Sequence, residues 1–169
     1  MSATAKAYVR GLIPDKENRE RDDFYPTPPE ATRALLDAET FNGDIWEPAC
    51  GDGAISKVLA ERGYRVHSSD LIDRGFGISG VDFLLDYETR CENIITNPPF
   101  KLADAFIRHG PSLVPRVIVL QRAMAIEGAG RADLIDKHLR AYWVGIDRPP
   151  AMHREGWQGN RLSNSGAPF

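Results

Sequence analysis

The sequence predicts an α/β fold with a mainly parallel sheet and helices on both faces. Short β-branched, apolar segments alternate along the chain with segments of helical periodicity, the pattern of parallel sheets with crossover helices. A length of 169 residues corresponds to one domain. The composition is 42% hydrophobic and 27% charged, and no apolar run approaches membrane-spanning length. We therefore expect one globular domain with no membrane contact.

Composition divides the chain into three regions. Residues 1–22 mix basic and acidic side chains and lack a hydrophobic signal core, so we expect a mobile arm on a cytoplasmic protein. Residues 23–150 hold the predicted strands and helices. Residues 151–169 form either a tail or an incomplete last hairpin. The two cysteines, Cys50 and Cys91, lack metal-ligand spacing, so we expect reduced thiols and no metal site.

The first helix is predicted over residues 31–38. Thr27 would cap it with its hydroxyl, and Pro28 and Pro29 would lie in its first turn. The Phe-Tyr pair at residues 24–25 could close over a ligand or could attach the N-terminal arm to the core.

A glycine turn at residues 49–53 follows a predicted strand over residues 43–48 and precedes a helix over residues 54–62, which Gly63 should end. Strand, glycine turn and helix in this order bring backbone N–H groups close to a ligand. We expect the glycines to be needed because a Cβ would block that approach. The spacing is not G-x-G-x-x-G, so it does not predict a nicotinamide or flavin site.

The next strand, residues 64–70, ends in an acid. Asp70 is positioned to accept hydrogen bonds from ribose hydroxyls, although a lone Asp at a strand end can also be a turn residue. In the glycine-rich residues 71–92, Asp82 followed by Phe83 could bind and cover an adenine ring, or Asp82 could cap a short helix.

Residues 93–100, Asn-Ile-Ile-Thr-Asn-Pro-Pro-Phe, are the centre of the predicted fold. A short buried strand over residues 93–96 ends in a stiff proline loop, at the strand end where open α/β sheets bind ligands. The Asn97 oxygen and a nearby carbonyl could accept both hydrogens of a planar amino group, with Phe100 stacked on its ring. The alternative is a simple Asn-Pro turn.

The remaining predicted elements alternate again. Helices are expected over residues 102–109 and 129–140, and strands over residues 115–121 and 141–146. The apolar run in the first of these strands predicts burial on both faces.

The net charge of −3 gives no support to sequence-independent DNA binding, which depends on a surplus of Lys and Arg. Any basic surface must be local. Residues 148–169 contain three arginines and one histidine against one glutamate, and they form either such a surface or a solvated tail.

Three motifs together resemble those of S-adenosylmethionine-dependent methyltransferases that act on amino groups, especially the N6-adenine DNA methyltransferases, several of which are small phage or prophage proteins. Residues 47–53, Glu-Pro-Ala-Cys-Gly-Asp-Gly, are similar to the first motif, commonly Asp-Pro-Ala-Cys-Gly-Ser-Gly. Residues 97–100 match the catalytic Asn-Pro-Pro-aromatic motif at every position. Residues 24–28 are similar to a motif that lies N-terminally where cofactor motifs precede the catalytic one. The resemblance covers residues 23–150, which would be the methyltransferase domain.

The resemblance implies a Rossmann-like class I methyltransferase fold that binds S-adenosyl-L-methionine. The implied cofactor-binding residues are Tyr25, Thr27, Glu47, Ala49, Gly51, Gly53, Asp70, Leu71, Asp82 and Phe83. Glu47, Gly51 and Gly53 would shape the methionine pocket, with Tyr25 and Thr27 along its end. Asp70 would bind the ribose, and Asp82 with Phe83 would bind the adenine.

The implied catalytic residues are Asn97, Pro98, Pro99 and Phe100. The Asn97 side chain and the Pro98 carbonyl would accept hydrogen bonds from the target amine, and Phe100 would stack on the target base. No metal or covalent nucleophile is required.

The function that the resemblance implies is methyl transfer to an exocyclic amino group, most plausibly adenine N6 in DNA. Alternatives are an amino or amide nitrogen in RNA or protein, or a catalytically inactive protein that binds the cofactor. Such sheets end in an antiparallel strand pair, of which residues 141–147 resemble only the first member. We therefore expect the final antiparallel strand to be missing and the sequence to belong to a longer protein.

Overall fold

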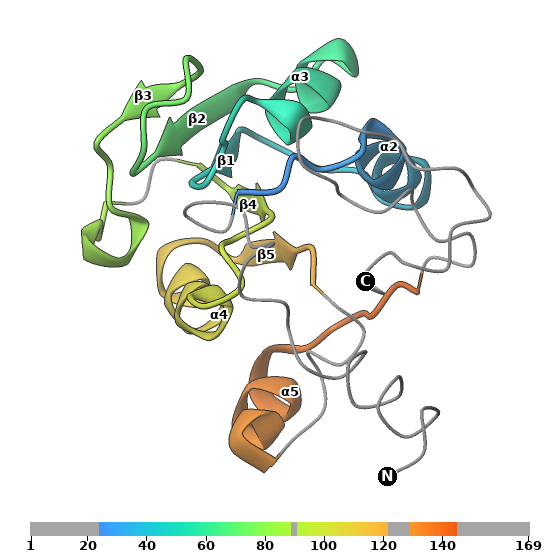
Figure 1. Ribbon diagram of the computed structural model, residues 1–169. Helices are drawn as coiled ribbons and strands as arrows, with labels where there is room; N and C mark the ends of the chain where they lie inside the picture. The colour runs from blue at the N-terminus through green and yellow to red at the C-terminus, as the bar shows by residue number, and fades with distance from the viewer. Residues whose placement is uncertain (1–23, 89–90, 122–128, 145–169) are drawn as a thin grey trace, which may run out of the picture.

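A computed structural model shows a five-stranded, all-parallel sheet with helices packed against it (Figure 1). It describes residues 24–88, 91–121 and 129–144. The strands are β1 (Ile45–Glu47), β2 (Val66–Asp70), β3 (Ile78–Ser79), β4 (Asn93–Thr96) and β5 (Arg116–Val119), in the order β3-β2-β1-β4-β5. This confirms the predicted α/β class and is consistent with a Rossmann-like fold.

Helices cover both faces of the sheet, as predicted. The α-helices are α2 (Pro29–Ala38), α3 (Ala54–Glu61), α4 (Ala103–Leu113) and α5 (Ala132–His138), and the short 3₁₀ helices are η3 (Phe83–Leu85) and η5 (Ala129–Arg131). Helices α2 and α3 pack together on one face, and α4 lies on the other (Figure 1). Helix α5 and the preceding η5 contact α4 through surface ion pairs, Arg108 with Asp133 of α5 and Asp104 with Arg131 of η5.

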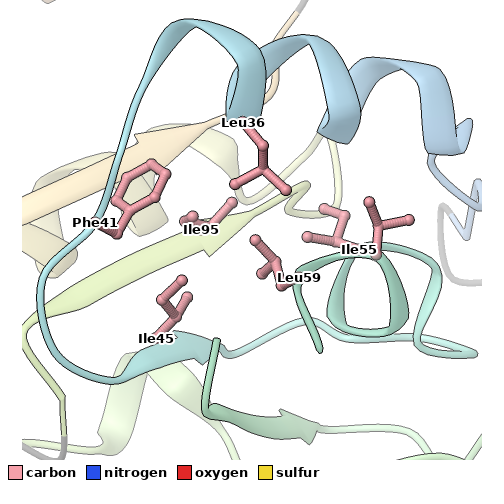
Figure 2. Close-up of a cluster of buried hydrophobic side chains, with 7 residues drawn as sticks. Leu36, Phe41, Ile45, Ile55, Leu59 and Ile95 are labelled. Carbon is pink, nitrogen blue, oxygen red and sulfur yellow. The ribbon is translucent and has the colours of Figure 1, made fainter. Parts of the chain in front are cut away.

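The central strands bury both of their faces because successive side chains point to opposite sides. Ile45 of β1 and Ile95 of β4 pack against α2 and α3. Figure 2 shows this cluster, with Leu36, Phe41, Ile45, Ile55, Leu59 and Ile95 converging between the two helices and the sheet. Their neighbours Trp46 and Ile94 point to the opposite face, where they pack with Phe83 and Phe106.

The strand order reverses between β1 and β4. From β1 the chain crosses through α3 to β2, and from β4 it crosses through α4 to β5 on the other face. The loops that leave the carboxyl ends of β1 and β4 therefore diverge. In open α/β sheets this divergence creates the ligand-binding crevice.

Helix α2 begins differently from the prediction. It starts at Pro29 with Pro28 as the N-cap residue, and no side chain caps it. The Thr27 hydroxyl instead accepts a hydrogen bond from the Asn97 amide. The predicted hydroxyl cap was therefore wrong, because a tertiary contact takes that oxygen.

Helix α4 is longer than the predicted residues 102–109. It continues through Gly110 and Pro111 to Leu113, and Val114 N–H still donates to the Gly110 carbonyl at 3.1 Å. A Cβ at Gly110 would meet the Val117 side chain at 3.1 Å. This close approach of α4 to β5 accounts for glycine in the last turn, where the sequence indicated a helix end.

Two strands also differ from the prediction. β3 was not predicted, because two residues inside a glycine-rich loop carry no periodicity, yet it pairs in parallel with β2. A strand was predicted over residues 141–146, but residues 141–144 have no regular structure and are exposed. Aromatic and β-branched residues favour a strand only where a neighbouring strand pairs with them, and these four pair with no strand in the described ranges.

Several predictions fall outside the described residues. These are the N-terminal arm at residues 1–22, residues 145–146 of the last predicted strand, the whole arginine-containing stretch at residues 148–169, and with it the C-terminal region at residues 151–169.

Candidate functional site

A cavity of about 370 Å³ lies at the carboxyl ends of β1, β2 and β4. Its volume is within the range of small-molecule sites. Every predicted site residue except Gly53 lines it: Tyr25, Thr27, Glu47, Ala49, Gly51, Asp70, Leu71, Asp82, Phe83, Asn97, Pro98, Pro99 and Phe100. The fold therefore brings together residues that are distant in sequence, such as Tyr25 and Asn97, which are 72 residues apart. They meet where the strand order reverses, the place where open α/β sheets bind ligands.

One wall of the cavity, which we call the acidic side, carries the carboxylates of Glu47, Asp52 and Asp70. Asp70 fixes the glycine turn to the end of β2. One of its oxygens accepts from Gly51 N–H at 2.8 Å, and the other accepts from Ile72 N–H at 2.9 Å. The backbone of this wall is thus held in position by a side chain of the neighbouring strand.

The two turn glycines have left-handed backbones, Gly51 with φ +55° and Gly53 with φ +84°. A Cβ at Gly51 would lie 2.4 Å from the Phe24 ring, and one at Gly53 would lie 2.6 Å from the Phe76 ring. Aromatic rings of the protein itself therefore lie where a Cβ would stand, which is a structural reason for both glycines. Gly51 lines the cavity and Gly53 does not, and the need for glycine in the approach of a ligand stays a prediction.

Glu47 is almost completely buried, with 2% of its surface exposed. Its carboxylate accepts from the backbone N–H of Ser56 at 2.8 Å and from the Ser56 hydroxyl, which lies 2.6 Å from the Ser68 hydroxyl. Burial raises the pKa of Glu47 to about 8, the Ser56 hydrogen bonds oppose this rise, and the carboxylates of Asp52 and Asp70 add to it.

Cys50 lies in the same wall and is also buried. Burial, with the nearby charges of Glu47 and Asp70, raises the pKa of its thiol to about 12. The thiolate is the reactive form of cysteine, so this thiol is inert at neutral pH.

Asp82 and Phe83 have structural contacts of their own. The Asp82 carboxylate accepts from Leu84 N–H at 3.0 Å and so caps η3, one of its two predicted roles. The Phe83 ring is buried against Trp46 and Phe106, with centroids at 5.3 and 4.5 Å. Both residues still line the cavity, and their contact with an adenine stays a prediction.

A second part of the cavity wall, which we call the amide side, consists of residues 97–100. The Asn97 amide nitrogen donates to the Thr27 hydroxyl at 3.1 Å and to the Tyr25 carbonyl at 3.4 Å. These bonds fix which end of the carboxamide faces residues 25–27. Pro98 is buried beside it, and the Phe100 ring is half-buried.

Residues 24–27, which we call the strap, connect the two walls. Phe24 lies on Gly51, and the Arg74 guanidinium stacks over its ring at 4.1 Å from the centroid. Tyr25 contacts Phe100, with ring centroids 5.5 Å apart and an interplanar angle of 38°. The Phe-Tyr pair therefore forms part of the cavity wall, with one ring on each side.

Sequence reasoning missed two cationic residues that line the cavity, Arg74 and Lys101. Arg74 lies in the glycine-rich loop after β2, which carries no motif. Lys101 directly follows the predicted catalytic motif and is exposed. Its position next to that motif was the only signal that could have singled it out.

No family model and no curated protein matches this chain. Fold and cavity define a doubly wound α/β protein with a cavity of small-molecule size where the strand order reverses. Among the described residues, no cluster of three or more His, Cys, Asp or Glu side chains could hold a metal ion. No helix in these ranges has the length and apolar character needed to cross a membrane.

Proposed function

We propose that the protein transfers a methyl group from S-adenosyl-L-methionine to an exocyclic amino group, adenine N6 in DNA, and that it acts in the cytoplasm. One observation carries the proposal. A single cavity combines an acidic wall built on a glycine turn with a wall built from Asn97, Pro98, Pro99 and Phe100.

The acidic side has the properties needed for a cationic nucleoside. When bound, S-adenosyl-L-methionine supplies an electrophilic methyl group on a positively charged sulfur. Three carboxylates, those of Glu47, Asp52 and Asp70, line this wall. A cation beside them would favour ionised Glu47, whose pKa of about 8 reflects burial near like charges. This wall would therefore bind a cation more tightly than a neutral ligand of the same shape.

The amide side supplies acceptors rather than a nucleophile. An exocyclic amine is a poor nucleophile because its lone pair is delocalised into the ring. Acceptors at Asn97 and at the Pro98 carbonyl would favour a pyramidal nitrogen whose lone pair points at the methyl group. Orientation of this kind can supply as much as roughly 7–11 kcal/mol of a barrier.

A base in duplex DNA must first leave the stack, which costs a few kcal/mol. Stacking against an aromatic side chain offsets about 1–3 kcal/mol of that cost. Phe100, half-buried at the cavity wall, is the predicted partner.

The test is to incubate the protein with S-adenosyl-L-methionine and unmethylated genomic DNA, digest the DNA and quantify methylated nucleosides by mass spectrometry. We expect N6-methyladenine from the wild type and at least a 100-fold decrease for Asn97→Ala, the size of effect seen when a key transition-state hydrogen bond is removed. A wild type that binds the cofactor and methylates no base in DNA would contradict the proposal. A methylated RNA base or protein amide would then identify the substrate, and no turnover on any of these would indicate a cofactor-binding protein without catalysis.

A further inference from the structure

Tyr25 has two contacts in the structure, and its predicted place at the methionine end of the cofactor stays a prediction. Its ring packs on Phe100, with centroids 5.5 Å apart. Its carbonyl accepts from the Asn97 amide at 3.4 Å. Both contacts belong to the amide side. Phe24, the adjacent residue, contacts Gly51 and Arg74 on the acidic side.

The Tyr25–Phe100 pair is closed as it stands. A planar group stacked between two rings needs about 7 Å between them, twice the usual carbon–carbon contact distance. The 5.5 Å between the centroids and the 38° tilt leave no room for a third ring. A ring that stacks on this face of Phe100 must separate the pair, and it then contacts Tyr25 as well.

We infer that the target ring inserts between Tyr25 and Phe100, so that Tyr25 is a substrate-binding residue and the substrate is a heteroaromatic base rather than a side-chain amide. This inference rests on the proposed function and identifies its substrate class. Two facing rings reward a flat, extended π-system, since both faces of the target are covered. A primary amide presents much less flat surface and gains little from a second ring.

Lys101 agrees with the same substrate class. It lines the cavity immediately after Phe100 and is exposed. A cation at the entrance of a base-binding cleft is suited to the phosphate that flanks an extruded base.

The test compares two neighbouring substitutions in the strap, Tyr25→Leu and Phe24→Leu. For each variant we would measure the Kd for S-adenosyl-L-methionine by calorimetry and the KM for unmethylated DNA in methyl transfer. Tyr25→Leu should raise the KM for DNA roughly 5- to 100-fold, the range for loss of one stacked ring, with a much smaller change in cofactor Kd. Phe24→Leu should show the reverse split. Tyr25→Phe, which keeps the ring, should stay near the wild-type KM.

A second readout does not depend on turnover. The fluorescence of a single-stranded oligonucleotide containing 2-aminopurine should be quenched by the wild type and by Tyr25→Phe, and much less by Tyr25→Leu. Cofactor binding by Tyr25→Leu verifies that this variant is folded.

Three results would overturn the inference. The first is an unchanged KM for DNA together with unchanged quenching in Tyr25→Leu. The second is an effect of Tyr25→Leu that is confined to the cofactor Kd. The third is methyl transfer to glutamine peptides in preference to DNA. An inactive wild type that still quenches the probe through Tyr25 would contradict the proposed reaction while it supports the ring pair.

Discussion

The two walls of the cavity are held in place by different means. On the acidic side, the Asp70 carboxylate binds the backbone N–H groups of Gly51 and Ile72, which lie 19 and 2 residues away in sequence. On the amide side, Asn97 is oriented by Tyr25 and Thr27, which lie 72 and 70 residues away. The acidic side is thus fixed by one β–α–β unit, whereas the amide side depends on docking of the strap. Changes in the acidic side should therefore affect stability and cofactor binding, and changes at Tyr25 and Thr27 of the strap should affect catalysis.

The largest effect is expected from the buried acid of the acidic side. The pKa of Glu47 is raised from 4.5 to about 8 in the folded chain. Between these two pH values, the folded chain therefore keeps a proton that the unfolded chain has released. Its contribution to stability is complete below pH 4.5 and is lost progressively as the pH rises to about 8, by about 5 kcal/mol at most. Glu47→Gln cannot ionise, so the variant does not lose this stability. Its unfolding free energy relative to that of the wild type should therefore rise between pH 4.5 and 8. Urea titrations at pH 5, 7 and 9 measure it, and a difference that does not change with pH would contradict the burial argument.

The covered glycines give the next largest effect. Gly53→Ala should lower the unfolding free energy by roughly 1–3 kcal/mol from left-handed backbone strain alone, and by more because its Cβ would meet Phe76 at 2.6 Å. Gly63→Ala is the matched control, since Gly63 has a similar φ of +89° with nothing within 4 Å of its Cβ. Thermal unfolding of both variants isolates the cost of the steric contact. Equal losses in the two variants would mean that Phe76 moves aside freely.

On the amide side, Thr27→Val should impair catalysis with little change in cofactor binding. The substitution keeps the shape of a buried side chain and removes the acceptor of the 3.1 Å bond from Asn97. Loss of one such bond costs about 1 kcal/mol, which corresponds to a decrease in kcat of roughly fivefold. Thr32→Val, at a buried position of α2, serves as the control. A Thr27→Val variant that weakens cofactor binding and leaves kcat intact would show that Thr27 acts on the acidic side and not on the amide side.

The smallest effect is expected from the thiols. Because the pKa of Cys50 is about 12 and Cys91 is also buried, neither should react with a disulfide reagent at pH 8 in the folded protein. Both should react fully in denaturant. Rapid labelling of Cys50 under native conditions would show that the acidic side opens readily.

The sequence predicted secondary-structure elements on both sides of the cavity. The residues of β4 were predicted with the observed bounds, because a β-branched run meets a cluster of breakers at Asn97. The α3 helix was predicted from the periodicity of its apolar residues. Its end was predicted from Gly63, because a glycine with a left-handed backbone commonly follows the last turn of a helix. Motifs at strand ends then converge because parallel strands share one edge of the sheet.

Contacts between distant segments could not be predicted. The order of residues in the strap carries no sign that Phe24 faces one wall and Tyr25 the other. The pKa of Glu47 depends on burial by side chains from several elements, which no local pattern encodes. The predicted strand at residues 141–146 is absent from the described part, residues 141–144, because strand formation depends on a pairing partner and not on composition alone.

The most direct test of the account is calorimetric titration of S-adenosyl-L-methionine into the wild type and two variants, Asp70→Ala and Asn97→Ala. The account predicts one cofactor per chain and a loss of affinity of at least about tenfold for Asp70→Ala, because two backbone N–H groups of the acidic side lose their charged acceptor. Asn97→Ala, on the amide side, should lose much less affinity than Asp70→Ala. A wild type that gives no heat of binding, or a larger loss for Asn97→Ala than for Asp70→Ala, would contradict the assignment of the acidic side to the cofactor.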